Sequence, residues 1–390
     1  MNYTAITISR DYGAGGSEVA KALADRLGWE LLDRELLHKA AAIEEVPDAE
    51  LERLDEQAVG LADRFRLHPP HERYIHGLRE AARQAAQRGK VVLVGRGTRQ
   101  LLGDTPGVFH LQLVASQQWR AQRMAWLERL PLEKSLARCT EFDRARQRFT
   151  QYFFGEESFL PSQYDIVVNA ERMALEDVAC VVGSLAPGAP TTPPPGAAGR
   201  VLTLAREVAA GDQRFPCTLG ERLGMRVCDR ELLEQEAVRL GVPEADIEHI
   251  EEHPSGIFQR FRPGSLYQRY CDVLGQLMQE HAARGEVLLV GRGSSRFLRD
   301  NPRAFHVRLV ASMAMRVRQV MQDRWLREEL AQREIAESDS QRARFYEGYF
   351  RADWADPLEY HITVNTGRLG PLAVDMVARA AERFWARALT

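Results

Sequence analysis

Apolar and polar positions along the first half of the chain follow two different periodic patterns, one typical of strands and one typical of helices. Short runs rich in β-branched and other apolar residues cover residues 5–9, 30–32, 91–94, 108–114 and 166–168. Longer stretches with apolar residues at helical spacing separate these runs, at 17–27, 35–42, 74–88 and, with interruptions, 116–153. Strands that alternate with helices are typical of a parallel sheet covered by helices on both faces. The pattern therefore predicts an α/β fold with a five-stranded parallel sheet.

The whole pattern occurs twice, at a constant offset of 196 residues. The segment DRELL at 33–37 returns at 229–233, VGRG at 94–97 returns at 290–293, and VAS at 114–116 returns at 310–312. A period this long indicates duplication of a whole domain and not the short repeating unit of a solenoid. We expect one domain at 1–185, an extended linker rich in Pro, Gly and Ala at 186–199, and a second domain of the same fold at 200–390.

The overall composition fits two globular domains and argues against several kinds of partner. The chain has 390 residues, 45% of them hydrophobic, and a net charge of −3 with both signs spread along it. This balance predicts no nucleic-acid partner and no membrane partner. The five cysteines form no CxxC pair, which argues for a reducing compartment and against a disulfide or zinc framework. With no leader-like segment and no membrane-length apolar run, we expect a cytoplasmic protein.

A glycine-rich turn follows the first predicted strand, in the segment ITISRDYGAGGSEVA at 6–20. A turn between a strand and a helix presents backbone N–H groups and a helix N-terminus, which together favour phosphate. Against the phosphate-loop pattern GxxxxGK[ST], Gly15 and Ser17 match, Arg10 replaces the first glycine and Gly16 replaces the lysine. A dinucleotide fingerprint fits less well because it requires glycine where Glu18 stands. A turn that binds nothing is the alternative.

Two further segments carry charge where ligands bind in α/β proteins. Arg96 follows the strand at 91–94, at the carboxyl edge of the sheet, where a guanidinium suits phosphate or carboxylate. A structural ion pair with Asp33 or Glu35 is the alternative. Asp143 and Arg146 are three residues apart in a helical stretch, so the carboxylate can orient the guanidinium. A solvated charged helix is the alternative for that pair.

Taken together, these segments resemble the cytidylate kinase-like family, which has a P-loop NTPase-type three-layer fold. The resemblance covers nearly all of the first copy and rests on five motifs in order: ISRDYGAGG at 8–16, DRELL at 33–37, VGRG at 94–97, Asp143-x-x-Arg146, and YDIVVN at 164–169. The second copy carries ARE at 205–207, DRELL at 229–233, GRG at 291–293 and Asp339-x-x-Arg342. Together the motifs imply a nucleotide kinase fold duplicated in tandem.

For the donor nucleotide, the resemblance implies ATP and Mg²⁺ as cofactors of the first copy. Gly13, Gly15 and Gly16 would surround the ATP phosphates, and Ser17 would be the Mg²⁺ ligand. Typical family members carry a lysine where this chain has Gly16. Arg10, directly after the preceding strand, is the cation expected to compensate in part.

For the acceptor, the resemblance implies a nucleoside monophosphate. Asp33 and Arg34 would border the acceptor nucleotide, and Arg96 would hold its phosphate. Arg146, steered by Asp143, would close over the transferred group as a lid arginine. Phosphoryl transfer depends on alignment and positive charge, so arginines and Mg²⁺ are the expected catalytic groups.

The leading hypothesis is therefore ATP-dependent phosphoryl transfer to a nucleoside monophosphate, CMP or dCMP. Gly97 stands where typical members carry an acid that reads the base, so selection of cytosine is open. The alternative is a catalytically degenerate pair of nucleotide-binding sensor or scaffold domains. A shikimate-type small-molecule kinase shares the fold but leaves the tandem copies unexplained. The sequence is compatible with pairing of the two copies within the chain and with a homodimer.

The second copy departs from the first at the glycine-rich turn. At the offset of 196 residues, Ala209 stands in place of Gly13, Asp212 in place of Gly16 and Gln213 in place of Ser17. A carboxylate at this position repels phosphate, and the hydroxyl suited to Mg²⁺ is lost. We expect no ATP in the second turn and a structural or regulatory role for the second copy.

Overall fold

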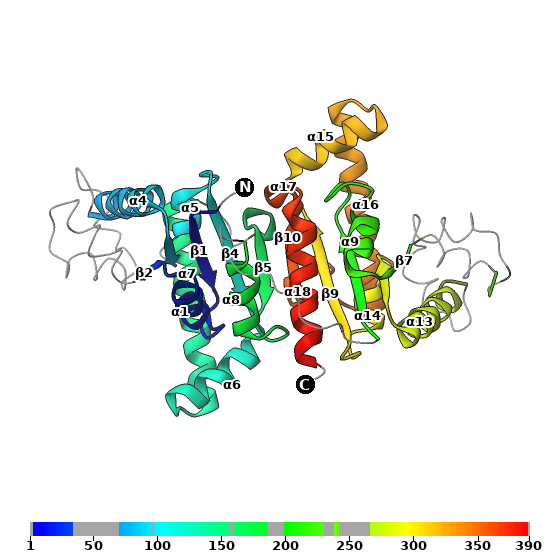
Figure 1. The fold of residues 1–390 in the computed structure, drawn as a ribbon, viewed down its shortest axis with the longest axis horizontal. Helices are drawn as coiled ribbons and strands as arrows, with labels where there is room; N and C mark the ends of the chain where they lie inside the picture. The colour runs from blue at the N-terminus through cyan, green and yellow to red at the C-terminus, as the bar shows by residue number, and fades with distance from the viewer. Residues whose placement is uncertain are drawn as a thin grey trace. The chain divides into compact units, whose positions relative to one another are not determined.

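The chain divides into two compact units, Met1–Thr192 and Pro193–Thr390 (Figure 1). The computed structural model describes residues 3–33, 70–95, 97–155, 160–185, 199–229, 238–239, 241 and 266–388. Of the predicted site residues, Arg34 and Arg96 lie outside these ranges, as do the predicted helix at 35–42 and all but the last residue of the predicted linker. The division between the units falls inside the segment expected to be that linker.

The first unit is built on a parallel sheet with the strand order β2-β3-β1-β4-β5. The strands are β1 (Ala5–Arg10), β2 (Glu30–Leu32), β3 (Val91–Val94), β4 (Val108–Val114) and β5 (Ile166–Asn169). Every residue of β3, β4 and β5 is buried, as expected for strands covered on both faces. Each strand-like run of the sequence is a strand of this sheet, and the α/β prediction is confirmed.

Helices cover both faces of this sheet. They are α1 (Gly16–Leu27), α4 (Pro70–Arg88), α5 (Thr98–Leu102), α6 (Gln117–Glu128), α7 (Leu132–Phe154), the 3-10 turn η2 (Pro161–Gln163) and α8 (Leu175–Gly183). Helices α4 and α5 pack on one face around Val91 and Leu93, together with the aromatic end of α7. Helices α1 and α8 pack against each other on the opposite face. The result is a three-layer unit.

Helices α6 and α7 form a hairpin, and its break has a local cause. The stretch at 116–153 was expected to be interrupted, and the interruption lies at residues 129–131. Arg129 ends α6 in the left-handed conformation, with φ 55°, and Pro131 precedes the first residue of α7. Proline is favoured at a helix start because the first turn needs no donor from it. The hairpin brings α7 back to the carboxyl edge of the sheet.

The second unit repeats the arrangement, with the strand order β7-β8-β6-β9-β10. Each of its strands begins and ends 196 residues after its counterpart: β6 (Val201–Arg206), β7 (Arg226–Cys228), β8 (Val287–Val290), β9 (Ala304–Val310) and β10 (Ile362–Asn365). The helices are α9 (Phe215–Leu223), α13 (Leu266–Arg284), α14 (Ser294–Phe297), α15 (Met313–Arg324), α16 (Glu328–Phe350), η3 (Pro357–Glu359), α17 (Thr366–Leu369) and α18 (Leu372–Ala388).

A buried polar pair marks the same point in both sheets. Thr7 of β1 is hydrogen-bonded through its hydroxyl to His110 Nδ1 of β4 at 2.6 Å. Thr203 of β6 and His306 of β9 make the same contact at 2.8 Å. Buried polar side chains are stable in a sheet when they satisfy one another in this way. The duplication therefore extends to individual interior contacts.

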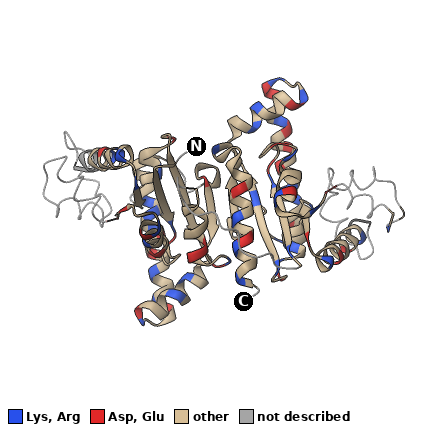
Figure 2. Cartoon of the chain, viewed as in Figure 1, with Lys and Arg blue, Asp and Glu red and all other residues tan. Residues whose placement is uncertain are grey.

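Charged residues of both signs are interspersed over the helices of each unit (Figure 2). Figure 2 thus agrees with the small net charge of −3. None of the helices in the described ranges has the length and apolar character that crossing a bilayer requires.

Candidate active site

The turn between β1 and α1 has the backbone geometry of an anion site. Gly13 and Gly15 have φ angles of 82° and 87°, a region that side chains with a Cβ rarely adopt. Within the turn, the Ala14 N–H donates to the Asp11 carbonyl at 3.2 Å. Gly15 is the N-cap of α1 and supplies no side-chain acceptor to the helix. The first amides of α1 are thus left without a side-chain cap, and they suit a phosphate.

Arg10 lies across this turn in space that two glycines leave open. A Cβ on Gly16 would lie 2.5 Å from Arg10 Cγ, and a Cβ on Gly95 would overlap Arg10 Nη1. Gly16 belongs to α1 and Gly95 follows β3, so the guanidinium lies between the glycine-rich turn and the end of β3. A lysine at position 16 does not fit beside Arg10 in this position. Arg10 and Gly16 are therefore complementary, and the arginine places a cation beside the turn.

Helix α7 is tied to the turn by Asp143 and Arg146. Asp143 Oδ1 accepts a hydrogen bond from the Tyr12 N–H at 3.2 Å, and Arg146 Nη1 donates to the Arg10 carbonyl at 3.0 Å. Burial lowers the pKa of the Arg146 guanidinium, and the negative charges of Asp143 and Asp11 oppose this effect. Arg146 is therefore held close to Arg10.

Arg120 is a site residue that the sequence analysis did not single out. This α6 side chain is 7% exposed and donates to the Tyr12 carbonyl at 2.9 Å, the Ala115 carbonyl at 2.9 Å and Asp143 Oδ2 at 2.8 Å. It thus connects the turn, the end of β4 and the α7 helix. Its recurrence as Arg316, which pairs with Asp339 at 2.6 Å, was a signal in the sequence that was available and was not used.

Asp11 is the second residue that the sequence analysis missed. Burial raises the pKa of its carboxyl from 3.8 to about 6, although the positive charge of Arg120 opposes the shift. Its Oδ2 accepts a hydrogen bond from the Ala115 N–H at 3.4 Å and lies 4.0 Å from Arg120 Nε. An acid recurs at the matched position as Glu207, whose pKa burial also raises. Asp11 thus connects the start of the turn to the residue that follows β4 and to Arg120.

These features agree with a comparison against models of protein families. The model of the cytidylate kinase-like family matches residues 5–172 and, a second time, residues 201–368. The chain belongs to the cytidylate kinase-like family. Its tandem organisation is therefore a duplication of one family domain.

Several solved structures resemble one copy of this cytidylate kinase-like chain. An uncharacterized protein from Eubacterium ventriosum is 22% identical, over 43% of this chain and 89% of that protein, with a TM-score of 0.34. Shikimate kinase from Acinetobacter baumannii in complex with shikimate is 15% identical, over 47% and 92%, with a TM-score of 0.27. A gluconokinase from Sinorhizobium meliloti is 18% identical, over 47% and 91%, with a TM-score of 0.28. No curated protein matches the chain.

Ser17 and Asp33 occupy positions at the same edge as the glycine-rich turn. Ser17 is exposed in the first turn of α1, and Asp33 is half-buried directly after β2. Because the strands are parallel, their carboxyl ends meet at one edge, which is where ligands of α/β proteins bind. Among the described residues, no three His, Cys, Asp or Glu side chains converge on a metal position. A single protein ligand, the Ser17 hydroxyl, is nonetheless compatible with Mg²⁺. This ion keeps several bound waters and is held mainly through substrate phosphates.

The second cytidylate kinase-like copy lacks the first helical turn at this place. Helix α9 begins at Phe215, the counterpart of Val19, so residues 212–214 are not helical where α1 has already begun. Pro216 in the first turn of α9 has no N–H to offer. Asp212 adds a carboxylate, and its carbonyl accepts a hydrogen bond from the Phe215 N–H at 3.2 Å. This turn therefore presents fewer donors and more negative charge than its counterpart.

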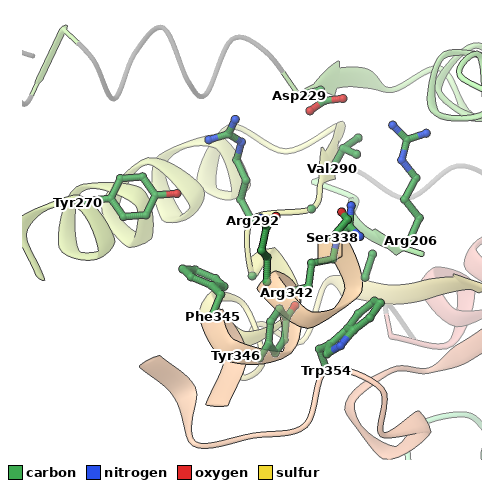
Figure 3. A pocket seen from close by; sticks show the side chains of 14 residues that line it. Arg206, Asp229, Tyr270, Val290, Arg292, Ser338, Arg342, Phe345, Tyr346 and Trp354 are labelled. Carbon is green, nitrogen blue, oxygen red and sulfur yellow. The ribbon is translucent and has the colours of Figure 1, made fainter. Parts of the chain in front are cut away.

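The second copy has a cavity at the carboxyl edge of its sheet, lined by residues that recur from the first copy. A cavity of about 360 Å³ opens at the carboxyl ends of β6, β7 and β8 and is closed by α16 (Figure 3). Arg206, Asp229, Arg292 and Arg342 line it, and they correspond to the predicted site residues Arg10, Asp33, Arg96 and Arg146. The counterparts of four residues that the sequence assigned to different parts of one site therefore line one cavity in the second unit.

Proposed function

We propose that the first unit transfers the terminal phosphoryl group of ATP to a nucleoside monophosphate, with CMP or dCMP as the acceptor. The observation that carries the proposal is the position of Arg10, which lies over the glycine-rich turn and faces the end of β3. Membership of the cytidylate kinase-like family supports it. Arg10 then supplies the positive charge that the phosphate-loop lysine supplies in other P-loop enzymes.

On the donor side, the backbone of Gly13, Gly15 and Gly16 surrounds the ATP phosphates, and the N-terminus of α1 faces them. Ser17 is the protein ligand of Mg²⁺, which neutralises phosphate charge when it is bound. The side chain of Arg10 packs closely against Gly16 and Gly95. A preorganised cation of this kind lowers the barrier because it needs no rearrangement when charge develops.

On the acceptor side, Asp33, Arg34 and Arg96 border the nucleoside monophosphate, and Arg96 binds its phosphate. Arg146 closes on the transferred group from α7, and Arg120 and Asp143 position the helix that carries it. Charge-assisted hydrogen bonds from guanidinium to phosphate are among the stronger ones in proteins. The chemistry assigned to these residues is orientation and charge stabilisation, with no covalent intermediate on the protein.

A second candidate function rests on Gly16, which stands where a phosphate loop carries its lysine. In that case the same residues bind nucleotide without transferring phosphate, and the protein is a sensor or scaffold. The two functions differ in one measurable quantity, the turnover of ATP in the presence of an acceptor. Nucleotide binding is common to both.

The test is transfer of labelled phosphate from ATP to CMP, dCMP, UMP and AMP by the full-length chain in Mg²⁺. Arg146→Ala is expected to lower kcat by about 10²–10³, the usual effect of removing one preorganised donor. Arg148→Ala is the matched control, because Arg148 is exposed on the same helix and its described hydrogen bond goes to the Arg144 carbonyl of that helix. Binding of nucleotide by wild type without transfer to any acceptor would establish the sensor function and refute the kinase.

A further inference from the structure

We propose that Tyr12 is a positioning residue of the first unit, which fastens the α6–α7 hairpin to the glycine-rich turn and so sets the place of Arg146. The inference rests on the function proposed for that site, in which Arg146 acts on the transferred phosphoryl group. Tyr12 stands at the start of the turn, directly before Gly13. Its backbone, its ring and its hydroxyl all contact the hairpin.

The hairpin holds the backbone of Tyr12 at both of its polar groups. The Tyr12 N–H donates to Asp143 Oδ1 of α7 at 3.2 Å, and its carbonyl accepts from Arg120 Nη1 of α6 at 2.9 Å. Asp143 and Arg120 also bind each other, at 2.8 Å. The carbonyl contact does not need a tyrosine, because Arg316 donates in the same way to the Val208 carbonyl at 2.8 Å in the second unit. The side chain of Tyr12 must therefore be considered separately.

The ring of Tyr12 stacks on Phe142 of α7. The ring centres are 4.4 Å apart and the planes differ by 7°. Phe142 is 39% exposed, so burial in the interior does not account for an aromatic side chain at this position. Phe142 and Arg146 are four residues apart and share a face of the helix. The Arg146 Cζ lies 6.0 Å from the centre of the Tyr12 ring, so Tyr12 contacts the face of α7 that carries this arginine.

The hydroxyl of Tyr12 reaches the other helix of the hairpin. It donates to Oε1 of Glu128, the last residue of α6, at 3.1 Å. Burial raises the pKa of Tyr12, and Glu128 raises it further, so the hydroxyl stays protonated and donates. Glu128 lies beside the bend of the hairpin, whereas Asp143 lies about three turns into α7. Contacts at two separated points fix the angle of the hairpin as well as its distance from the turn.

The side-chain contacts of Tyr12 distinguish the two units. At the offset of 196 residues, Val208 stands in place of Tyr12, Ser338 in place of Phe142 and Arg324 in place of Glu128. A valine offers neither a ring to stack nor a hydroxyl to donate. The contacts are thus present in the unit that keeps its glycine-rich turn and are lost in the unit whose turn has changed. This distribution associates them with the phosphate site and not with the stability of the common fold.

The expected consequence is an effect on transfer and not on nucleotide binding. Tyr12 belongs to the turn and lies against the helix face of Arg146, so it relates the place of the phosphates to the place of the arginine. A displacement of about 1 Å in a catalytic group can cost on the order of 100-fold in rate. The turn amides proposed to bind ATP keep their geometry without the Tyr12 side chain. Loss of that side chain should therefore lower kcat and leave KM for ATP nearly unchanged.

The experiment measures phosphate transfer by the full-length chain with Tyr12→Val, which introduces the residue of the second unit. We expect kcat to fall about 10- to 100-fold, with a change in KM for ATP below about threefold. Phe142→Ser should have a similar effect, and the double variant should add little, because both changes break the same stack. Tyr12→Phe keeps the stack and should retain most of the activity. Trp126→Ala is the control, because Trp126 is 80% exposed on α6 and should leave kcat unchanged.

Two results of the transfer assay would overturn the role of Tyr12. One is an unchanged kcat in Tyr12→Val. The other is a fall in kcat that is matched by a lower melting temperature and a weaker affinity for ATP, since that combination indicates a structural role alone.

Hydrogen exchange of the backbone amides at 117–154, with an ATP analogue and Mg²⁺ bound, tests the fastening without turnover. These amides should exchange about 10-fold faster in Tyr12→Val than in wild type. Equal exchange in the two proteins would refute the fastening. If wild type transfers phosphate to no acceptor, the function proposed for the first unit fails, and the exchange experiment still decides whether Tyr12 holds the hairpin.

Discussion

A side chain introduced at Gly16 is expected to destabilise the protein through one identifiable contact. Gly16 is not among the residues with positive φ, so the backbone itself tolerates a Cβ. The obstacle is Arg10, whose Cγ and Cβ lie 2.5 Å and 3.0 Å from the position of that Cβ. These atoms are near the backbone and cannot move away as a flexible side-chain end can. Overpacking of this kind costs about 1–3 kcal/mol.

The assay is urea unfolding of wild type, Gly16→Ala, Arg10→Ala and the double variant. Gly16→Ala should lower the free energy of unfolding by about 1–3 kcal/mol in wild type and by much less once Arg10 is truncated. The two changes therefore couple, and the coupling energy measures the contact directly. Additivity within about 0.5 kcal/mol would show that Arg10 does not occupy the space beside Gly16.

The contact between Arg10 and position 16 also leads us to expect an effect on nucleotide binding and transfer. Gly16→Lys restores the lysine of the phosphate-loop pattern, yet it should reduce ATP affinity and phosphate transfer because it displaces Arg10. In the double variant Arg10→Ala, Gly16→Lys the new lysine has room, and activity should exceed that of Arg10→Ala alone. Binding of an ATP analogue with Mg²⁺ is measured in parallel, so the reasoning can be tested even without turnover. Higher affinity or faster transfer in Gly16→Lys alone would refute it.

Three further predictions concern stability and stoichiometry. The raised pKa of Asp11, about 6 against 3.8, means that its contribution to stability is present below pH 4 and lost as pH rises to about 6. Wild type should therefore lose up to about 3 kcal/mol of unfolding free energy relative to Asp11→Asn between pH 4 and pH 7. Urea unfolding at each pH measures this difference, and a difference that stays constant with pH contradicts the prediction. Arg120→Ala removes the partner of a partly buried carboxylate and should cost about 3–5 kcal/mol in the same assay, whereas a loss below about 1 kcal/mol contradicts its bridging role. Calorimetry with an ATP analogue and Mg²⁺ should find one site per chain that Gly15→Val removes and Gly211→Val does not; a second site abolished by Gly211→Val contradicts an inactive second turn.

The repeat and the strands were determined by the sequence itself. Strands buried on both faces of a parallel sheet must be apolar throughout, so 91–94 and 108–114 stand out without knowledge of the fold. A glycine-rich turn is equally local, because positive φ at Gly13 and Gly15 requires residues without a Cβ. The break between α6 and α7 is marked by Pro131 for a similar local reason. The family followed from the order of such local motifs.

The tertiary structure alone decided which charges meet. The position of the Arg10 side chain depends on the space left by Gly95. Gly95 is far from Arg10 in the sequence and lies next to it because β1 and β3 pair. Asp143 was expected to orient Arg146 from three residues away, and its charge does act on Arg146, while its described hydrogen bonds to Tyr12 and Arg120 could not be inferred from that spacing. Helical spacing fixes which side chains share a face and says nothing of what another element brings to that face. For the same reason the pKa of Asp11, which burial controls, could not be inferred from its neighbours in the chain.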